Sequence, residues 1–200
     1  MFAFLLFIIC FGFIVWMLVF TIKNQNKKVQ KYYDAFCQKY SLKLTRMGGT
    51  KLYKHPEVGG TYQNRGMNII SYVAYRRRPS TIVEIGINNA IKFDFVIFSG
   101  KENRFYLTHS QNDRVKTNDP ELDKQFYIYS KVKPEQGFRI TAYLINGLKK
   151  WPTDVPLRLY INGNVLSTVI DKVVVNEKVA QTVHKAVDAM YQLAPALEQS

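Results

Sequence analysis

Three consecutive arginines, Arg76, Arg77 and Arg78, are the sharpest chemical feature of this sequence. They stand between Tyr75 and Pro79, where two stretches rich in β-branched residues meet, so we expect them at the tip of a β-hairpin. Guanidinium groups bind phosphate through paired hydrogen bonds, whether the phosphate belongs to a lipid or to a nucleic acid. The alternative is a solvated turn whose charge protects the hairpin from aggregation.

A second basic feature directly follows an apolar N-terminal run and consists of four lysines: Lys23, Lys27, Lys28 and Lys31. Residues 23–78 hold thirteen Lys or Arg against two carboxylates, whereas residues 79–200 hold fifteen against thirteen. The net charge of +13 is therefore concentrated next to the apolar run. Anionic headgroups attract basic residues near a membrane by roughly 1 kcal/mol each, so we expect anionic lipid headgroups as partners, and not nucleic acid.

Residues that could support catalysis or metal binding are scattered. The three histidines have no zinc-type spacing and no neighbouring cysteine, and we expect each on a solvated surface: His55, His109 and His184. Asp119, Glu121 and Asp123 alternate as calcium ligands do, but Pro120 and the missing glycine spoil the loop. No phosphate loop, nucleophile elbow or metalloprotease motif occurs.

We therefore expect no enzyme activity, no catalytic or metal-binding residue, no cofactor and no small-molecule substrate. An enzyme whose site is assembled from distant residues is the alternative. Trp151, beside Lys149 and Lys150, suits either an interface or the cap of a core.

The apolar run itself, residues 1–22, has no charged side chain and no proline. A helix of about 20 residues crosses the roughly 30 Å hydrocarbon layer, so the run predicts a transmembrane helix. A signal peptide is the rival, but nothing basic precedes the run and no small-residue cleavage site ends it. We expect no cleavage.

The lysines after this helix predict its orientation, because Lys and Arg tend to stay on the cytoplasmic side. We expect a single-pass protein with its N-terminus outside and its C-terminal domain in the cytoplasm. Cys10 lies in the apolar run and Cys37 outside it, so no disulfide is expected, in agreement with a reducing compartment. Large aromatic side chains in the run suit packing against helices of other membrane subunits: Phe4, Phe7, Phe11 and Trp16.

The pattern turns amphipathic after the run. From residue 24 to 42, the side chains of Val29, Tyr33, Phe36 and Tyr40 fall on one helical face. This helix could continue the membrane helix or lie separately across the domain, and its stripe could pack on the domain's own sheet or form a short coiled coil. We divide the chain into a transmembrane helix (1–22), a basic juxtamembrane helix (23–45) and a domain (46–200).

The domain reads mostly as sheet. Glycines at 48–49 and the segment 56–60 are expected to be turns, and Asn162-Gly163 predicts a type I′ hairpin. A middle helix is expected from Pro134 to about residue 150, and a last helix capped by Asn176 and frayed by Pro195. The expected strands are 67–75, 81–87, 92–98, 125–130, 157–161 and 165–175, with a weak strand at 61–63, at most a short one at 50–53 and another short one at 105–107. This pattern predicts an α+β fold with a mostly antiparallel sheet.

Two segments, PEVGGTYQNR (56–65) and ELDKQFYIYS (121–130), carry a weak resemblance to uncharacterised bacterial single-pass membrane-anchored proteins. The resemblance implies a bacterial inner (plasma) membrane location and no particular activity. Together these observations favour a non-enzymatic accessory, scaffold or assembly subunit of a larger inner-membrane complex. The alternative is a sensor of anionic lipid that uses the juxtamembrane lysines and the arginine hairpin tip.

Overall fold

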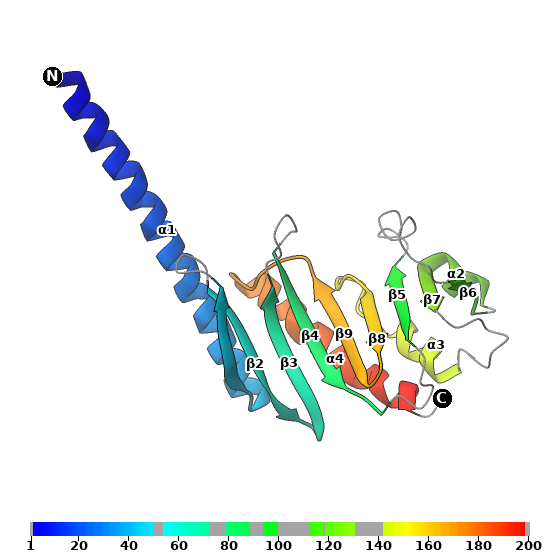
Figure 1. Ribbon diagram of the computed structural model, residues 1–200. Helices are drawn as coiled ribbons and strands as arrows, with labels where there is room; N and C mark the ends of the chain where they lie inside the picture. The colour runs from blue at the N-terminus through cyan, green and yellow to red at the C-terminus, as the bar shows by residue number, and fades with distance from the viewer. Residues whose placement is uncertain are drawn as a thin grey trace.

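The computed structural model describes residues 2–49, 54–72, 79–88, 94–99, 113–117, 119–130 and 142–198. In these ranges a long N-terminal helix leads into a nine-stranded antiparallel sheet with further helices, which confirms the α+β class. Figure 1 shows the first half of the helix standing away from the sheet, whereas its second half runs alongside the strand β2 (Lys54–Tyr62).

The N-terminal helix α1 (Phe2–Tyr40) is unbroken over 39 residues. It contains no proline and only Gly12 as a helix-weakening residue, and at about 1.5 Å per residue it is roughly 58 Å long. By length and composition it is apolar enough to cross a membrane, and none of its most apolar window is buried. The amphipathic stripe therefore belongs to a continuation of the apolar helix.

The end of α1 is set by Ser41, which adopts a left-handed conformation with φ of 55°. This conformation lets the Leu42 amide donate a hydrogen bond to the Cys37 carbonyl at 3.0 Å, the pattern of a helix C-cap. The predicted end of the juxtamembrane helix at residue 45 is therefore wrong, because Lys43 already begins a strand.

The strands form one sheet in the order β1-β2-β3-β4-β9-β8-β5-β7-β6, and each adjacent pair is antiparallel. The C-terminal hairpin β8–β9 is thus inserted between β4 and β5. The bounds are β1 (Lys43–Gly49), β2 (Lys54–Tyr62), β3 (Arg65–Tyr72), β4 (Ser80–Gly86), β5 (Phe95–Ser99), β6 (Asp113–Val115), β7 (Phe126–Ser130), β8 (Arg158–Asn162) and β9 (Val165–Ile170).

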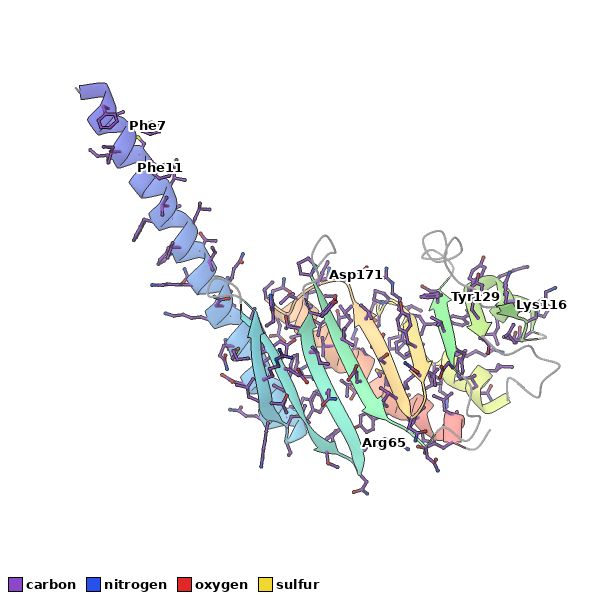
Figure 2. The ribbon with its side chains drawn as sticks, in the orientation of Figure 1. Phe7, Phe11, Arg65, Lys116, Tyr129 and Asp171 are labelled. Atoms are coloured by element: carbon purple, nitrogen blue, oxygen red, sulfur yellow. The ribbon has the colours of Figure 1, made fainter. Side chains whose placement is uncertain are left out.

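The core lies on one face of this sheet. Alternate residues of the central strands point into it, and Ile69, Val83 and Leu166 have no exposed surface. The helix α4 (Glu177–Glu198) contacts β4 and β9, and α3 (Ala142–Lys149) packs against α4. The second half of α1 packs against β2, so helices from both ends of the chain complete one core (Figure 2).

Two stretches that we expected to be turns lie inside strands instead. The glycines at 48–49 end β1, and the segment around Pro56 belongs to β2. Pairing of β2 with β3 starts only at Glu57, so no carbonyl of β3 needs the N–H that proline lacks. A Cβ at Gly59 would lie 2.4 Å from Asn68 Oδ1, so a larger residue there would require the Asn68 side chain to move.

The tight hairpins also differ in detail from the prediction. Strands β8 and β9 form the expected hairpin, but Asn162 pairs with Val165, so the loop is Gly163-Asn164 and only Gly163 has a positive φ (55°). This pattern fits a type II′ turn and not type I′. Gln63-Asn64, with φ of 47° and 62°, forms the type I′ pattern between β2 and β3.

Helix α4 begins as predicted, since Asn176 Oδ1 accepts a hydrogen bond from the Val179 amide at 3.0 Å. The expected fraying at Pro195 is wrong, because the helix continues to Glu198 with Pro195 on its exposed side. The polar stretch before residue 125 contains β6 and a short helix, α2 (Pro120–Gln125), that we did not expect. Pro134, segment 105–107 and the tip of the β3–β4 hairpin lie outside the described residues.

Candidate functional site

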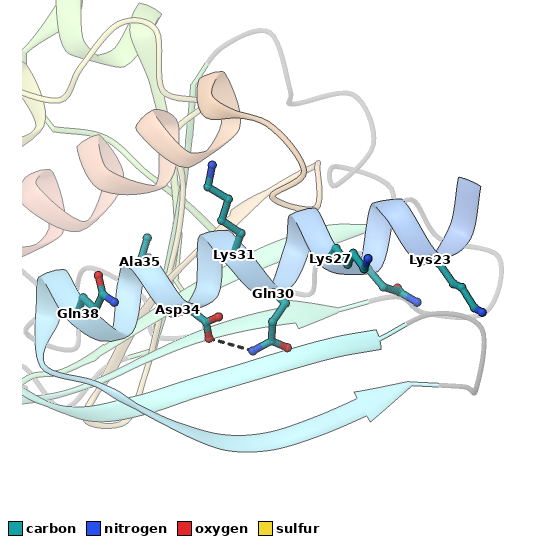
Figure 3. A pocket seen from close by; sticks show the side chains of 8 residues that line it. Lys23, Lys27, Gln30, Lys31, Asp34, Ala35 and Gln38 are labelled. Atoms are coloured by element: carbon teal, nitrogen blue, oxygen red, sulfur yellow. Dashed lines mark hydrogen bonds between the residues drawn. The ribbon is translucent and has the colours of Figure 1, made fainter. Parts of the chain in front are cut away.

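The second half of α1 carries an open groove of about 790 Å³ on a face different from the one that enters the core. Lys23, Lys27 and Lys31 line it at intervals of four residues, which places them on one side of the helix. The other lining residues are Asn26, Gln30, Asp34, Ala35 and Gln38 (Figure 3).

Charge changes along this lysine groove. The lysines alternate with polar amides in its N-terminal half, whereas Asp34 brings a carboxylate into its C-terminal half. Gln30 Nε2 donates a hydrogen bond to Asp34 Oδ1 at 2.9 Å, as Figure 3 shows, so the carboxylate is held at that end. An anion is therefore attracted to the half nearest the apolar segment and repelled from the other half.

The core-facing side of α1 explains why the lysines are presented outward. Val29 is 5% exposed, and Tyr33, Phe36 and Tyr40 have no exposed surface. The predicted packing of this stripe on the domain's own sheet is confirmed. Burial of these side chains fixes the rotation of α1, so the groove face has one orientation relative to the sheet.

The predicted anion-binding residues are only partly brought together. Lys23, Lys27 and Lys31 share the groove, whereas Lys28 is exposed on α1 outside the groove lining. The arginines at 76–78 lie outside the described residues, so their role at a hairpin tip stays a prediction. Pairing of β3 with β4 does confirm the hairpin itself.

The aromatic residues expected to contact other helices are exposed but fall into two groups. The rings of Phe7 and Phe11 stack with centroids 6.3 Å apart, and Phe4 shares their face by its spacing. Trp16 stacks on Phe20 at 5.6 Å. Trp16 stands five residues after Phe11, which turns it about 140° around the helix.

A cluster of rings, here named the aromatic clamp, holds the end of α1 against α4. The Tyr40 hydroxyl lies 2.6 Å from His184 Nδ1, and Phe36 packs edge-on against the His184 ring at 5.2 Å. Tyr40 also packs against Tyr62 at 5.0 Å, and the Tyr191 hydroxyl donates a hydrogen bond to the Tyr62 carbonyl at 2.8 Å. These five residues connect α1, β2 and α4.

The solvated position expected for each histidine is wrong for His184, which is half-buried in the clamp. Burial lowers the pKa of His184, and the Lys39 ammonium lowers it further, against the opposing effect of Asp188 and Glu177. His55 is also half-buried. Sequence reasoning missed the Tyr40–His184 pair because 144 positions separate the two residues, and only Tyr40's place in the apolar stripe hinted at a buried contact.

An ion pair fixes the other end of α4. Arg65 on β3 contacts the Glu198 carboxylate through both terminal nitrogens, with Nη2 at 2.7 Å from Oε2. The backbone N–H of Asn88 donates a hydrogen bond to the same carboxylate at 2.8 Å. The hydrogen bond from Arg65 holds the pKa of Glu198 below its usual range. Burial raises this pKa, and the hydrogen bond from the Asn88 backbone lowers it further.

Two other candidates from the sequence, Trp151 and the acidic stretch 119–123, make structural contacts, and Asp119 caps α2. Trp151 is 7% exposed and donates from Nε1 to the Val155 carbonyl at 3.1 Å, so it caps the core. Within the described ranges, no three side chains of His, Cys, Asp or Glu converge as metal ligands would.

Comparisons with known proteins give little for this chain. No family model matches it, and no curated protein matches it in sequence. Among solved structures, the crystal structure of the mycobacterial trehalose monomycolate transport factor A, TtfA, is similar over 84% of this chain and 96% of that chain, with 9% identity and a TM-score of 0.49. Similarity at this level does not establish a shared function.

Proposed function

We propose that this chain is a non-enzymatic accessory or scaffold subunit of a membrane complex, held in the membrane by α1. The observation that carries the proposal is the continuity of α1, in which one helix provides both an exposed apolar segment and three core residues without exposed surface: Tyr33, Phe36 and Tyr40. A flexible linker would let a domain tumble beside its anchor. A continuous helix instead sets which surface of the domain faces the bilayer and which faces its neighbours.

The proposed place of the chain is a bacterial inner membrane, with the N-terminus outside and the sheet domain in the cytoplasm. Lysines directly after residue 22 support this orientation. Partners in the membrane would contact the face formed by Phe4, Phe7 and Phe11, where large exposed rings offer surface for helix packing.

Photocrosslinking in intact membranes tests this function. A photoreactive residue placed at Phe11 should give a protein adduct of discrete mass, because this face is proposed to contact a partner helix. The matched control is Cys10, which lies at nearly the same depth but about 100° around the helix from Phe11 and about 120° from Trp16, and a photoreactive residue placed there should react mainly with lipid. Protein adducts from neither position, or equal adducts from both, would contradict a partner-facing side of α1.

A second function, sensing of anionic lipid at the membrane surface, is favoured by one observation. Three of the four juxtamembrane lysines share one groove and are not spread around the helix: Lys23, Lys27 and Lys31. Both functions need the same anchor, and an accessory subunit could also bind lipid.

A further inference from the structure

The lysine groove begins where the proposed membrane span ends. Lys23 is the first residue after the apolar run, Lys27 lies about 7.5 Å beyond Ile22 along the helix axis, and Lys31 about 13 Å beyond it. The headgroup layer on each side of a bilayer is roughly 5 to 8 Å thick. Lys23 and Lys27 thus lie at headgroup depth, and Lys31 lies just outside, within a Debye length of the surface.

Helix geometry tilts the first bond of each lysine side chain toward the bilayer. Each Cα–Cβ bond in a helix tilts toward the N-terminus, which for α1 is the proposed membrane side. The Lys31 side chain projects sideways from the helix in Figure 3, and a change of rotamer brings its ammonium toward the headgroups, while Asp34, held by Gln30, closes the groove to anions on the other side. The favourable position for an anion lies between Lys23 and Lys31.

The spacing of the lysines indicates the kind of anion. Neighbouring lysines are about 6 Å apart along the axis, whereas Lys23 and Lys31 are about 12 Å apart. One phosphate can lie between two neighbouring ammonium groups but cannot contact all three. A headgroup with two phosphates can use the three lysines together, one phosphate between each neighbouring pair.

We propose that the lysine groove binds a single anionic lipid whose headgroup carries two phosphates, as in a diphosphatidylglycerol. Basic pockets between membrane helices on the cytoplasmic side bind such headgroups, and the lysine groove presents the same charges on the face of one helix. This inference rests on the membrane anchoring in the proposed function, and it adds the class of lipid and the residues that select it.

Lipid binding to the full-length chain in mild detergent, followed by native mass spectrometry, tests the inference. The probes are cardiolipin and phosphatidylglycerol, compared at equal phosphate concentration. We expect one cardiolipin to remain bound, and Lys27→Ala to weaken that binding by about five-fold, the equivalent of roughly 1 kcal/mol per lysine. Lys28→Ala is the matched control, since it removes the same charge at the same depth outside the groove, and it should change binding less than two-fold.

Two results would overturn the inference. Equal losses for Lys27→Ala and Lys28→Ala would show that only the depth of the charge matters, and equal retention of both lipids would show that two phosphates in one headgroup are not recognised. Alkaline washing of membranes distinguishes this failure from failure of the proposed function: a chain that resists extraction is anchored whether or not it selects a lipid. Both lysines are exposed, and the unfolding midpoint of each variant should equal that of the unaltered chain.

Discussion

At the scale of single residues, the contact between Tyr40 and His184 connects the proposed anchor to the last helix of the domain. The strength of this contact depends on the protonation state of His184. Its Nδ1 can accept a hydrogen bond from the Tyr40 hydroxyl only when that nitrogen carries no proton. Burial favours the neutral ring, and Lys39 does so as well.

This contact should make stability depend on pH. The pKa of His184 is lower in the folded chain than its ordinary value of about 6.5, so below that pH the unfolded chain binds a proton that the folded chain does not. The free energy of unfolding should fall as pH drops from about 7 to 5, by at most roughly 1.4 kcal/mol per pH unit. Urea unfolding in mild detergent at several pH values measures it.

The control for this prediction is His184→Gln, whose amide can accept a hydrogen bond from Tyr40 but does not titrate. Its free energy of unfolding should fall less steeply over the same pH range, and the slope that remains is expected from His55, whose pKa is also lowered by burial. An unaltered slope in this variant would assign the pH dependence to other groups.

Glu198 stabilises the fold in its charged form, whereas His184 does so in its neutral form. Its carboxylate accepts hydrogen bonds from Arg65 and from the Asn88 amide, and its pKa is lowered, so its contribution is present above the unfolded pKa of about 4.5 and lost as pH falls through the folded value. Glu198→Ala should lower the free energy of unfolding at pH 7 by about 1 to 2 kcal/mol, since the pair is partly exposed. Near pH 3 the difference between the variant and the unaltered chain should shrink, and a constant difference in urea unfolding would contradict this reading.

At the scale of elements, local patterns predicted most strands and the last helix but not how they pair. The strands around residues 69, 83, 128 and 160 and the N-cap at Asn176 have strong local signals. The sequence wrongly predicted turns at Pro56 and at the glycines of β1 and β2. These residues lie in strands because they pair with segments distant in the sequence, and a local pattern does not reveal that pairing. The insertion of β9 between β4 and β8 has the same cause.

The candidate site was predictable to a similar extent. The basic character of the juxtamembrane segment is visible in the sequence, and spacing by four already separates Lys23, Lys27 and Lys31 from Lys28. The place of Asp34 in the groove and the clamp around His184 depend on which face of α1 is buried, and therefore on tertiary packing.

The two tight turns offer a test at this scale. Gly163 has φ of 55°, where a Cβ is strained, so Gly163→Ala should lower the free energy of unfolding by about 1 kcal/mol. Gln63 adopts a similar φ of 47° with a side chain, so Gln63→Gly should be neutral or stabilising. Urea unfolding of both variants in mild detergent measures these effects. Equal destabilisation by both changes would contradict the assignment of left-handed conformations in these turns.

At the scale of the whole molecule, we propose that the two halves of α1 have different roles: the first half crosses the bilayer, and the second half forms part of the core. Its first half is exposed throughout the residues whose side chains are described, whereas four side chains of its second half are buried: Val29, Tyr33, Phe36 and Tyr40. The boundary between these two halves falls at the lysines.

A cysteine scan along α1 in sealed native membranes tests this division most directly, with Cys10 and Cys37 replaced and a membrane-impermeant maleimide as the probe. We predict no labelling from residue 6 to 22 from either side of the membrane, and labelling at positions 23, 27 and 31 only in inside-out vesicles. Positions 33, 36 and 40 should stay unlabelled until the domain is unfolded. Ready labelling of residues before 22, or equal labelling of all positions after 23, would contradict a helix that is both membrane anchor and core element.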